Sequence, residues 1–219
     1  MRFIAGRAFA IGAIGLATLS LTGCNEEIDA RQTKEIQGLL YKIHAEDPFT
    51  GRVTNYPISV LGLFNVGTCI VDFKKGLPDG DMKCADNAGT VVGTGEFKAG
   101  KKDGKAERFD PKTNKKVVVE HWKNGRQDGV QEQYDAQTGE KILEVSYTEG
   151  RKDGRERAWD IAGKEKIADL EWKNGLQSGF DNRGTQHRNY VNGKKQGLQQ
   201  DYSIDGNRWY LASENIYDN

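Results

Sequence analysis

One eight-residue pattern recurs along most of this 219-residue chain and limits what it can fold into. The pattern is an aromatic residue, two variable residues, a glycine, three variable residues and a second glycine, as in residues 122–129. Successive leading aromatics are separated by 24, 25, 25, 25 and 18 residues. The leading aromatics are Phe73, Phe97, Trp122, Tyr147, Trp172 and Tyr190. A near-constant period of this length predicts a repeat array in which each unit is one supersecondary element.

Each unit is predicted to be a β-hairpin. Apolar residues occupy every second position in segments such as 143–147 and 168–172, which is the periodicity of a strand with one buried face. Asn-Gly at 124–125 and 174–175 favours a two-residue hairpin turn, because both residues tolerate positive φ. A helix is disfavoured, since glycine recurs in every unit. One hairpin cannot bury its apolar face alone, so we expect an all-β fold in which units stack on their neighbours.

The repeated unit resembles the bacterial variant of the MORN repeat, which is often described as an antitoxin-type repeat. The resemblance covers residues 69–206, and residues 48–51 are similar to the opening repeat of that family. It implies an elongated, twisted antiparallel sheet of repeated hairpins. It also implies a protein-binding role as an antitoxin or immunity protein, although the motif is specific for the repeat class and not for one function.

The composition favours an extended sheet over a thick two-layer core. Hydrophobic residues make up 36% of the chain and the mean hydropathy is −0.74. The chain has 27 glycines and only 4 prolines, which indicates many tight turns rather than a proline-rich disordered segment. Basic and acidic residues both number 32, and this balance argues against a dedicated nucleic-acid binder, which usually has a basic excess.

The N-terminal segment has the features of an export signal. A start with two arginines precedes an apolar stretch, residues 8–21, that is too short to span a bilayer. A buried N-terminal helix is the alternative. The Leu-Thr-Gly triplet before Cys24 resembles a bacterial lipobox, which implies cleavage after residue 23 and lipidation of Cys24. Asn25, in place of aspartate, favours an outer-membrane lipoprotein that faces the periplasm, with the cell surface as the alternative.

The sequence divides into five predicted segments. They are a lipoprotein signal peptide (1–23), a membrane tether (24–36), a first hairpin repeat with an insertion (37–68), the MORN-like array (69–206) and a C-terminal cap (207–219). Within them, residues 36–43 have apolar spacing that fits either a helix or the start of the first hairpin, so both alternatives stay open.

The other two cysteines, Cys69 and Cys84, are an even pair in an exported chain and flank one predicted turn. If Phe73 faces Gly80 across that hairpin, Cys69 faces Cys84, and residues 76–77 become the centre of a type II′ turn. A turn centred one residue earlier shifts this register unless a bulge intervenes. We predict a disulfide, because the alternative of a reactive thiol lacks a neighbouring histidine or a Cys-x-x-Cys motif.

No catalytic or cofactor motif is found in the sequence. The three histidines, at positions 44, 121 and 187, lack metal-ligand spacing, and neither a nucleophile elbow nor a phosphate-binding loop occurs. Aspartates recur before the second glycine, where a turn-forming hydrogen bond to the backbone explains them better than acid catalysis. These aspartates are Asp79, Asp103, Asp128 and Asp153. We therefore expect no metal, no cofactor and no enzymatic activity.

Basic residues are frequent in the same turns. Aligned in an array, they would form a row able to contact anionic lipid or an acidic partner, but they equally solvate hairpin tips and protect sheet edges. The residues are Lys101, Lys102, Arg126, Arg151, Lys152, Lys194 and Lys195.

A second set of aromatics follows five residues after the second glycine in four units. The set consists of Phe109, Tyr134, Trp159 and Tyr202. The leading aromatics are expected to be mostly core, whereas the second set covers the other side of the sheet or lines an exposed surface. Tyrosine and tryptophan are enriched in interface hot spots, so the second set is the candidate partner-binding surface.

Together these features favour a lipid-anchored periplasmic binding protein that neutralises a secreted antibacterial toxin by steric occlusion. The expected partner is a protein toxin, for which a phospholipase effector delivered by a type VI system is the preferred example because such an enzyme works at the membrane. No nucleic acid is expected as a partner, and contact with the membrane is expected through the lipid anchor. The alternative is a structural envelope scaffold that binds lipid or peptidoglycan through its turns.

Overall fold

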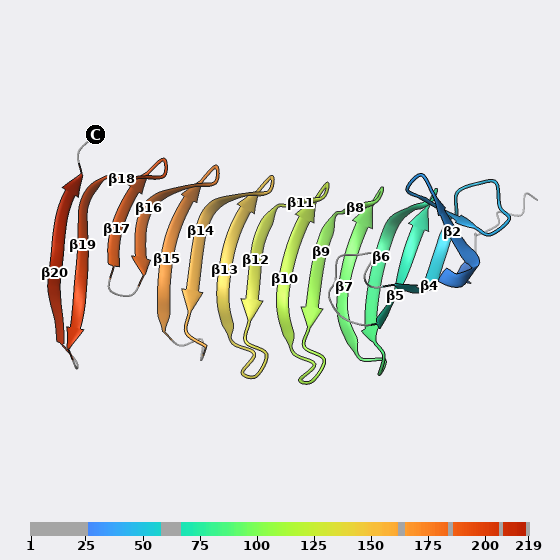
Figure 1. Ribbon diagram of the computed structural model, residues 1–219, viewed down its shortest axis with the longest axis horizontal. Helices are drawn as coiled ribbons and strands as arrows, with labels where there is room; N and C mark the ends of the chain where they lie inside the picture. The colour runs from blue at the N-terminus through green and yellow to red at the C-terminus, as the bar shows by residue number, and fades with distance from the viewer. Residues whose placement is uncertain (1–25, 58–66, 162–164, 184–185, 206–207, 218–219) are drawn as a thin grey trace, which may run out of the picture.

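The computed structural model describes residues 26–57, 67–161, 165–183, 186–205 and 208–217. Nearly all of them are strands of one long sheet, beside a separate two-stranded hairpin. The sheet is a single row of antiparallel hairpins that runs the length of the molecule (Figure 1). The all-β hairpin array predicted from the sequence is therefore confirmed.

The elements fall into an N-terminal group and the repeat array. The first group contains β1 (Glu27–Asp29), the 3₁₀ helix η1 (Ala30–Gln32), β2 (Thr33–Ile36), β3 (Leu39–Lys42), β4 (Gly51–Pro57), β5 (Gly67–Lys74) and β6 (Leu77–Asp86). The array continues with β7 (Val91–Lys98), β8 (Lys101–Lys102), β9 (Gly104–Phe109), β10 (Lys116–Lys123), β11 (Arg126–Gln127), β12 (Gly129–Tyr134) and β13 (Lys141–Thr148). It ends with β14 (Arg151–Trp159), β15 (Lys166–Lys173), β16 (Leu176–Arg183), β17 (Gln186–Val191), β18 (Lys194–Lys195), β19 (Gly197–Asp205) and β20 (Arg208–Tyr217).

The N-terminal group differs from the array in having a parallel strand and a separate hairpin. Strand β1 pairs in parallel with β4, where Ile28 lies opposite Val53. Strands β2 and β3 pair with each other, which settles the two alternatives for residues 36–43 in favour of a hairpin. The segment predicted as a membrane tether is thus folded from Glu27 onward. The predicted insertion lies partly in β4 and β5, and its residues 58–66 are outside the described ranges.

The turn of each unit consists of two residues with positive φ, which defines a type I′ hairpin turn. In the unit of Trp122, Asn124 has a φ of 51° and Gly125 a φ of 81°. The backbone N–H of Gly125 donates to the carbonyl oxygen of Lys102 in the preceding hairpin, at 2.8 Å. The same bond, at the same length, is made by Gly76, Gly100, Gly125, Gly150, Gly175 and Gly193. The turns therefore form a hydrogen-bonded ladder along one long edge of the sheet (Figure 1).

The second glycine of each unit accommodates an irregularity that follows the turn. Gly104 has a φ of 118°, and a Cβ added to it would lie 2.2 Å from Oε2 of Glu96 on the neighbouring strand. The glycines at this position have φ values between 67° and 123°, which L side chains rarely adopt. They are Gly80, Gly104, Gly129, Gly154, Gly179 and Gly197. Both glycines of the repeat are thus required by backbone geometry.

The buried apolar residues are concentrated at the N-terminal end of the sheet. Strands β4, β5 and β6 contribute most of the cluster, and residues from β1, β3, β7 and the segment before β4 pack with them. The cluster consists of Ile28, Leu40, Phe49, Val53, Cys69, Val71, Phe73, Met82, Cys84 and Val92. Along the remainder of the sheet only Val119, Val145, Ala168 and Leu170 are buried apolar residues among those described. A single-layer sheet has no second layer against which further apolar side chains could be buried, which agrees with the low hydrophobic content of the sequence.

Strand β20 is the last described strand and pairs with β19 along its whole length. It lies at the opposite end of the row from the β2–β3 hairpin (Figure 1). Leu211 is 52% exposed and Ile216 is 70% exposed. Within the segment predicted as a C-terminal cap, residues Arg208–Tyr217 form this strand, and the side chains of Tyr210, Leu211 and Ile216 are exposed.

Candidate binding faces

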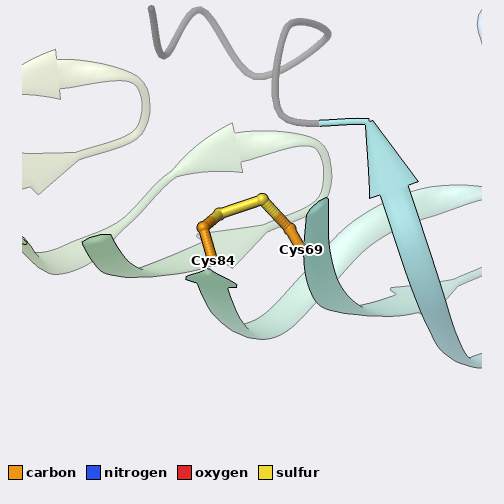
Figure 2. The surroundings of a disulfide bond; sticks show 2 residues. All are labelled: Cys69 and Cys84. Atoms are coloured by element: carbon orange, nitrogen blue, oxygen red, sulfur yellow. A yellow bond between two sulfur atoms is a disulfide. The ribbon is translucent and has the colours of Figure 1, made fainter. Parts of the chain in front are cut away.

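The Cys69–Cys84 pair is a disulfide that joins β5 to β6, with a Sγ–Sγ distance of 2.00 Å (Figure 2). The two cysteines lie opposite each other in the strand register, as predicted. The predicted turn is wrong, however. The turn residues are 75–76, so Phe73 pairs with Pro78 and not with Gly80. An irregularity between these pairs, beside Gly80, restores the register that brings the two sulfurs together.

The predicted lipidation site, Cys24, lies outside the described residues, as does the signal segment 1–23. Both therefore stay predictions from the sequence.

The two sets of aromatics lie on opposite faces of the sheet. Successive side chains of a strand alternate between faces, so an odd separation reverses the side. Glu156 lies opposite Leu170, on the same face as Trp172, whereas Trp159 is three residues beyond Glu156 and faces the other way. We call these the leading-aromatic face and the second-aromatic face. Applied to the other pairings, the same rule places Phe109, Tyr134 and Tyr202 on the second-aromatic face.

The second-aromatic face carries a ladder of ion pairs between its rings. Lys141 pairs with Glu132 and, at 2.9 Å, with Glu144 of its own strand. Arg157 continues the ladder with contacts of 3.2 Å to Glu144 and 3.9 Å to Asp169. Their side chains are between 22% and 32% exposed. The charges therefore hold one another in place across four adjacent strands.

Two rings of the second-aromatic face, those of Tyr134 and Tyr202, contact polar neighbours of the same face. The Tyr134 hydroxyl donates to Oε2 of Glu132 at 2.9 Å, and Lys116 Nζ lies 5.4 Å from the ring centroid. The Tyr202 ring contacts the His187 ring at a centroid distance of 5.1 Å. All four second-set aromatics are half-buried, so each exposes part of its ring. With about 4.8 Å between strands, rings of successive units lie about 10 Å apart.

The ion pairs shift the pKa values of their members. Burial opposes ionisation of Glu132, but hydrogen bonds from Lys141 and Tyr134 lower its pKa overall. Burial likewise acts against the charge of Lys141, but its bonds to Glu132 and Glu144 raise its pKa. A hydrogen bond from Lys105 is the main cause that lowers the pKa of Glu107. These groups are charged at neutral pH, so the face presents fixed alternating charges and not a titrating acid–base pair.

The leading-aromatic face is organised by cations that contact the next unit. Lys102 Nζ lies 4.6 Å from the centroid of the Trp122 ring, and Lys152 Nζ lies 4.6 Å from that of Trp172. Each lysine belongs to the hairpin that precedes its ring, so these cation–π contacts join neighbouring units. The leading aromatics were expected to be mostly core, but only Phe73 is buried and the other five are half-buried.

Two buried glutamines, which the repeat pattern did not predict, bridge the backbone beside the second glycine. Gln131 donates from Nε2 to the carbonyl oxygen of His121 at 2.9 Å, and its Oε1 accepts from the His121 N–H at 3.1 Å. Gln199 makes the same pair of bonds with the backbone of Asn189, at 3.1 and 3.3 Å. The signal in the sequence is a glutamine two residues after the second glycine. This motif compensates for backbone bonds that a regular ladder would make here.

The recurring aspartates bond to the backbone of the next unit's turn, whereas the sequence predicted that they would bond to the backbone of their own turn. Asp103 Oδ2 accepts the backbone N–H of Asn124, in the next turn, at 2.9 Å. Asp79 accepts equivalently from Ala99 at 3.0 Å, and Asp128 and Asp153 do so at 3.1 and 3.4 Å. They therefore strengthen the turn ladder. The basic residues Lys101, Arg126, Arg151 and Lys194 are exposed at the same edge, whereas Lys102 and Lys152 turn onto the rings.

Within the described ranges, no group of three or more His, Cys, Asp or Glu residues is arranged to hold a metal ion. The described residues also contain no helix with the length and apolarity needed to cross a membrane. No family model matches the chain, and no curated protein matches it. The resemblance to MORN repeats stays a prediction that rests on the repeated residues.

Proposed function

We propose that this protein is a lipid-anchored binding protein that faces the periplasm and neutralises a secreted antibacterial toxin by covering the toxin's working surface. The observation that carries the proposal is the row of half-buried aromatic rings on the second-aromatic face, in which Phe109, Tyr134 and Trp159 come from successive units and ion pairs lie beside them. Tyrosine and tryptophan concentrate in interface hot spots. Side chains that are already ordered lose little conformational entropy on binding, which favours tight association.

The export signal and the lipobox motif suggest where binding takes place. An antitoxin anchored in the outer membrane meets only toxins that act in the periplasm or on its membranes. A phospholipase delivered by a type VI system fits this location, because a membrane tether holds the inhibitor where the enzyme must work. The resemblance to antitoxin-type MORN repeats supports the same role.

The proposed mechanism is steric and requires no chemistry of the inhibitor. A standard interface buries about 800 Å² on each partner. The sheet presents the rings Phe109, Tyr134 and Trp159 over three consecutive units, so a partner can contact several hairpins at once. Neutralisation demands that little free toxin remains, and nanomolar affinity corresponds to about −12 kcal/mol.

The proposal is tested by protection of cells. Deleting the gene is expected to sensitise cells to a toxin that acts in the periplasm, and the neighbouring genes are the first place to find that toxin. The full-length protein should restore growth, whereas a form without residues 1–23, retained in the cytoplasm, should not. Protection by the cytoplasmic form would contradict the proposed location.

The surface is tested by the double variant Tyr134→Ala/Trp159→Ala. It should lose protection while its circular dichroism spectrum stays that of a β-sheet. Tyr210→Ala, which removes an aromatic that is 48% exposed on β20, is the matched control and should protect normally. Equal protection by both variants would exclude the second-aromatic face as the toxin-binding surface.

A second candidate function is an envelope scaffold, and the exposed cations of the turn edge favour it. A Cβ added to Gly125 would lie 3.6 Å from Cβ of Lys101, and one added to Gly150 would lie 3.7 Å from Cβ of Arg126, so these cations recur at the same place beside successive turns. The triple variant Lys101→Gln/Arg126→Gln/Arg151→Gln should lower binding to vesicles of anionic lipid or to purified peptidoglycan if this function is correct. Undiminished toxin protection by that variant would favour the antitoxin role.

A further inference from the structure

Strand β7 departs from the pattern that the other leading strands follow. Two glycines, Gly93 and Gly95, occupy the positions four and two residues before the leading aromatic Phe97. Most other units carry larger side chains there, such as Leu143 and Val145 before Tyr147. Glycine inside a strand weakens it and often marks a place where a ligand or another chain approaches closely.

A positive φ is not the reason for these two glycines. Neither has the positive φ that the turn and second glycines of the repeat share. A Cβ added to Gly95 would lie 3.1 Å from Cε of Met82 and 3.7 Å from Cβ of Ala106. The nearer contact is the end of a flexible side chain, so a small shift of Met82 would accommodate alanine. The absence of side chains at Gly93 and Gly95 leaves space beside the strand, and both glycines line it.

That space is a hollow of about 140 Å³ that opens mainly on the leading-aromatic face. Met82, Phe97 and Ala106 supply its apolar lining beside the two glycines. An apolar cavity of about 150 Å³ is large enough to bind benzene. The hollow thus has the size of one phenyl ring or one leucine side chain, and is much too small for a drug-sized ligand.

Charged side chains surround this apolar lining. Lys102 lies over the Trp122 ring, and Glu120 accepts a hydrogen bond from Nε1 of Trp122 at 3.3 Å, so both are held by the same residue. Arg108 lies between Gly93 and Val118 in the register, is exposed, and has no ion-pair partner among the described residues. Glu96 and Glu107 also line the hollow, but they belong to the second-aromatic face, where Glu107 pairs with Lys105 and Lys116. On the leading-aromatic face two cations face one anion, which favours a ligand that carries a carboxylate on that side.

We propose that this hollow receives one phenyl- or leucine-sized side chain of a protein partner, and that an acidic group next to that side chain pairs with Arg108. The identification of the occupant as a protein rests on the proposed binding function. The pocket would anchor the partner from the leading-aromatic face, separately from the row of second-set aromatics. A buried anchor in a pocket, with a charged pair at its rim, is the usual composition of an interface hot spot.

The pocket is tested on the folded, disulfide-bonded protein with phenylacetate, benzylamine and acetate as probes. Phenylacetate should shift the NMR signals of the Met82 and Ala106 methyl groups in a saturable manner, because it combines a ring with a carboxylate. Benzylamine should bind more weakly, since its cation meets Arg108 and Lys102, and acetate should leave both methyl signals unchanged. Equal shifts with phenylacetate and benzylamine would overturn the proposed preference for an acid.

Two variants and one control complete the test. Gly95→Val should abolish the phenylacetate shifts because it fills the hollow, and Arg108→Glu should weaken binding about threefold or more. Arg155→Glu removes an exposed arginine of the second-aromatic face and should have no effect. Binding that survives Gly95→Val would overturn the pocket, and if that variant does not fold, unchanged affinity in Arg108→Glu would do so. These shifts do not depend on toxin protection, so the two proposals can fail separately.

Discussion

Different interactions stabilise the two ends of the sheet. At the N-terminal end, strands β4 to β6 share a buried apolar cluster with residues of β1, β3 and β7, and a disulfide crosses the cluster. Beyond Phe97, polar side chains such as Gln131, Arg188 and Gln199 are buried where a core would hold apolar groups. The same hairpin unit is therefore stabilised by burial at one end and by hydrogen bonds and ion pairs at the other.

This difference shows how a one-layer array can continue without a core. Each added hairpin contributes a turn-to-turn bond at its first glycine, and most add an aspartate bond from the preceding unit. These are nearest-neighbour interactions, so stability should be roughly additive along the array. The N-terminal unit, which has the apolar cluster and the disulfide, is expected to be the most stable part and the C-terminal hairpins are expected to open first.

The largest expected effect comes from removing the Cys69–Cys84 disulfide. Its sequence separation is 15 residues, and closing such a loop contributes about 3 kcal/mol by the chain-entropy account. The double variant Cys69→Ser/Cys84→Ser should lose most of this free energy of unfolding in urea titrations. Hydrogen exchange should quicken in β4 to β7 and change little in β13 to β15. Equal acceleration along the whole sheet would show that the two ends unfold as one unit.

The next effect is expected at the second glycine of a C-terminal unit. Gly154 has a φ of 103°, and an added Cβ would lie 3.0 Å from Cβ of Ser146. Gly154→Ala should therefore cost about 2 kcal/mol through backbone strain and crowding. Gly38→Ala is the control, because its φ of 78° is also positive but nothing lies within 4 Å of the added Cβ. If thermal unfolding shows the same loss of stability in both variants, the positive φ alone accounts for the effect.

A smaller effect should follow from Gln131→Leu. The variant leaves the backbone N–H and carbonyl of His121 without the two bonds that Gln131 supplies, which should cost about 1.5 kcal/mol. Gln133→Leu, at an exposed position of the same strand, should stay within about 0.5 kcal/mol of the native protein. If both variants have the same urea midpoint of unfolding as the native protein, buried polar hydrogen bonds do not replace the missing apolar core.

The smallest effect is a pH dependence of the ion-pair ladder. Because the folded-state pKa of Glu132 is lowered, its contribution to stability is present above the ordinary glutamate pKa of about 4.3 and is lost as pH falls through the folded value. Glu132→Gln should therefore lose a few tenths of a kcal/mol at pH 7 and almost nothing at pH 3. The exposed Glu140→Gln serves as the control in urea titrations at both pH values. A larger loss at pH 3 would contradict this sign.

Local features of the sequence were sufficient to predict that each unit is a β-hairpin and that the hairpins form an array. Alternating residues and Asn-Gly turns report the conformation of a few adjacent residues, and these predictions are confirmed. The disulfide was predicted by placing Cys69 opposite Cys84, although the turn assumed for that hairpin was one residue too late. In the structure the cysteine pairing results instead from a type I′ turn at residues 75–76 together with a register shift beside Gly80.

Only the tertiary structure reveals the interactions between units. Lys75, Ala99 and Glu149 adopt the positive φ that asparagine adopts in other turns, because each turn is bonded to its neighbour. The sequence by itself determined the repeat, its strands and the cysteine pair, since local spacing governs these. The bridging role of Gln131 and the ion pair between Arg157 and Glu144 depend on register across strands. Those contacts join residues that are distant in sequence, so the hydrophobic pattern of one strand does not contain them.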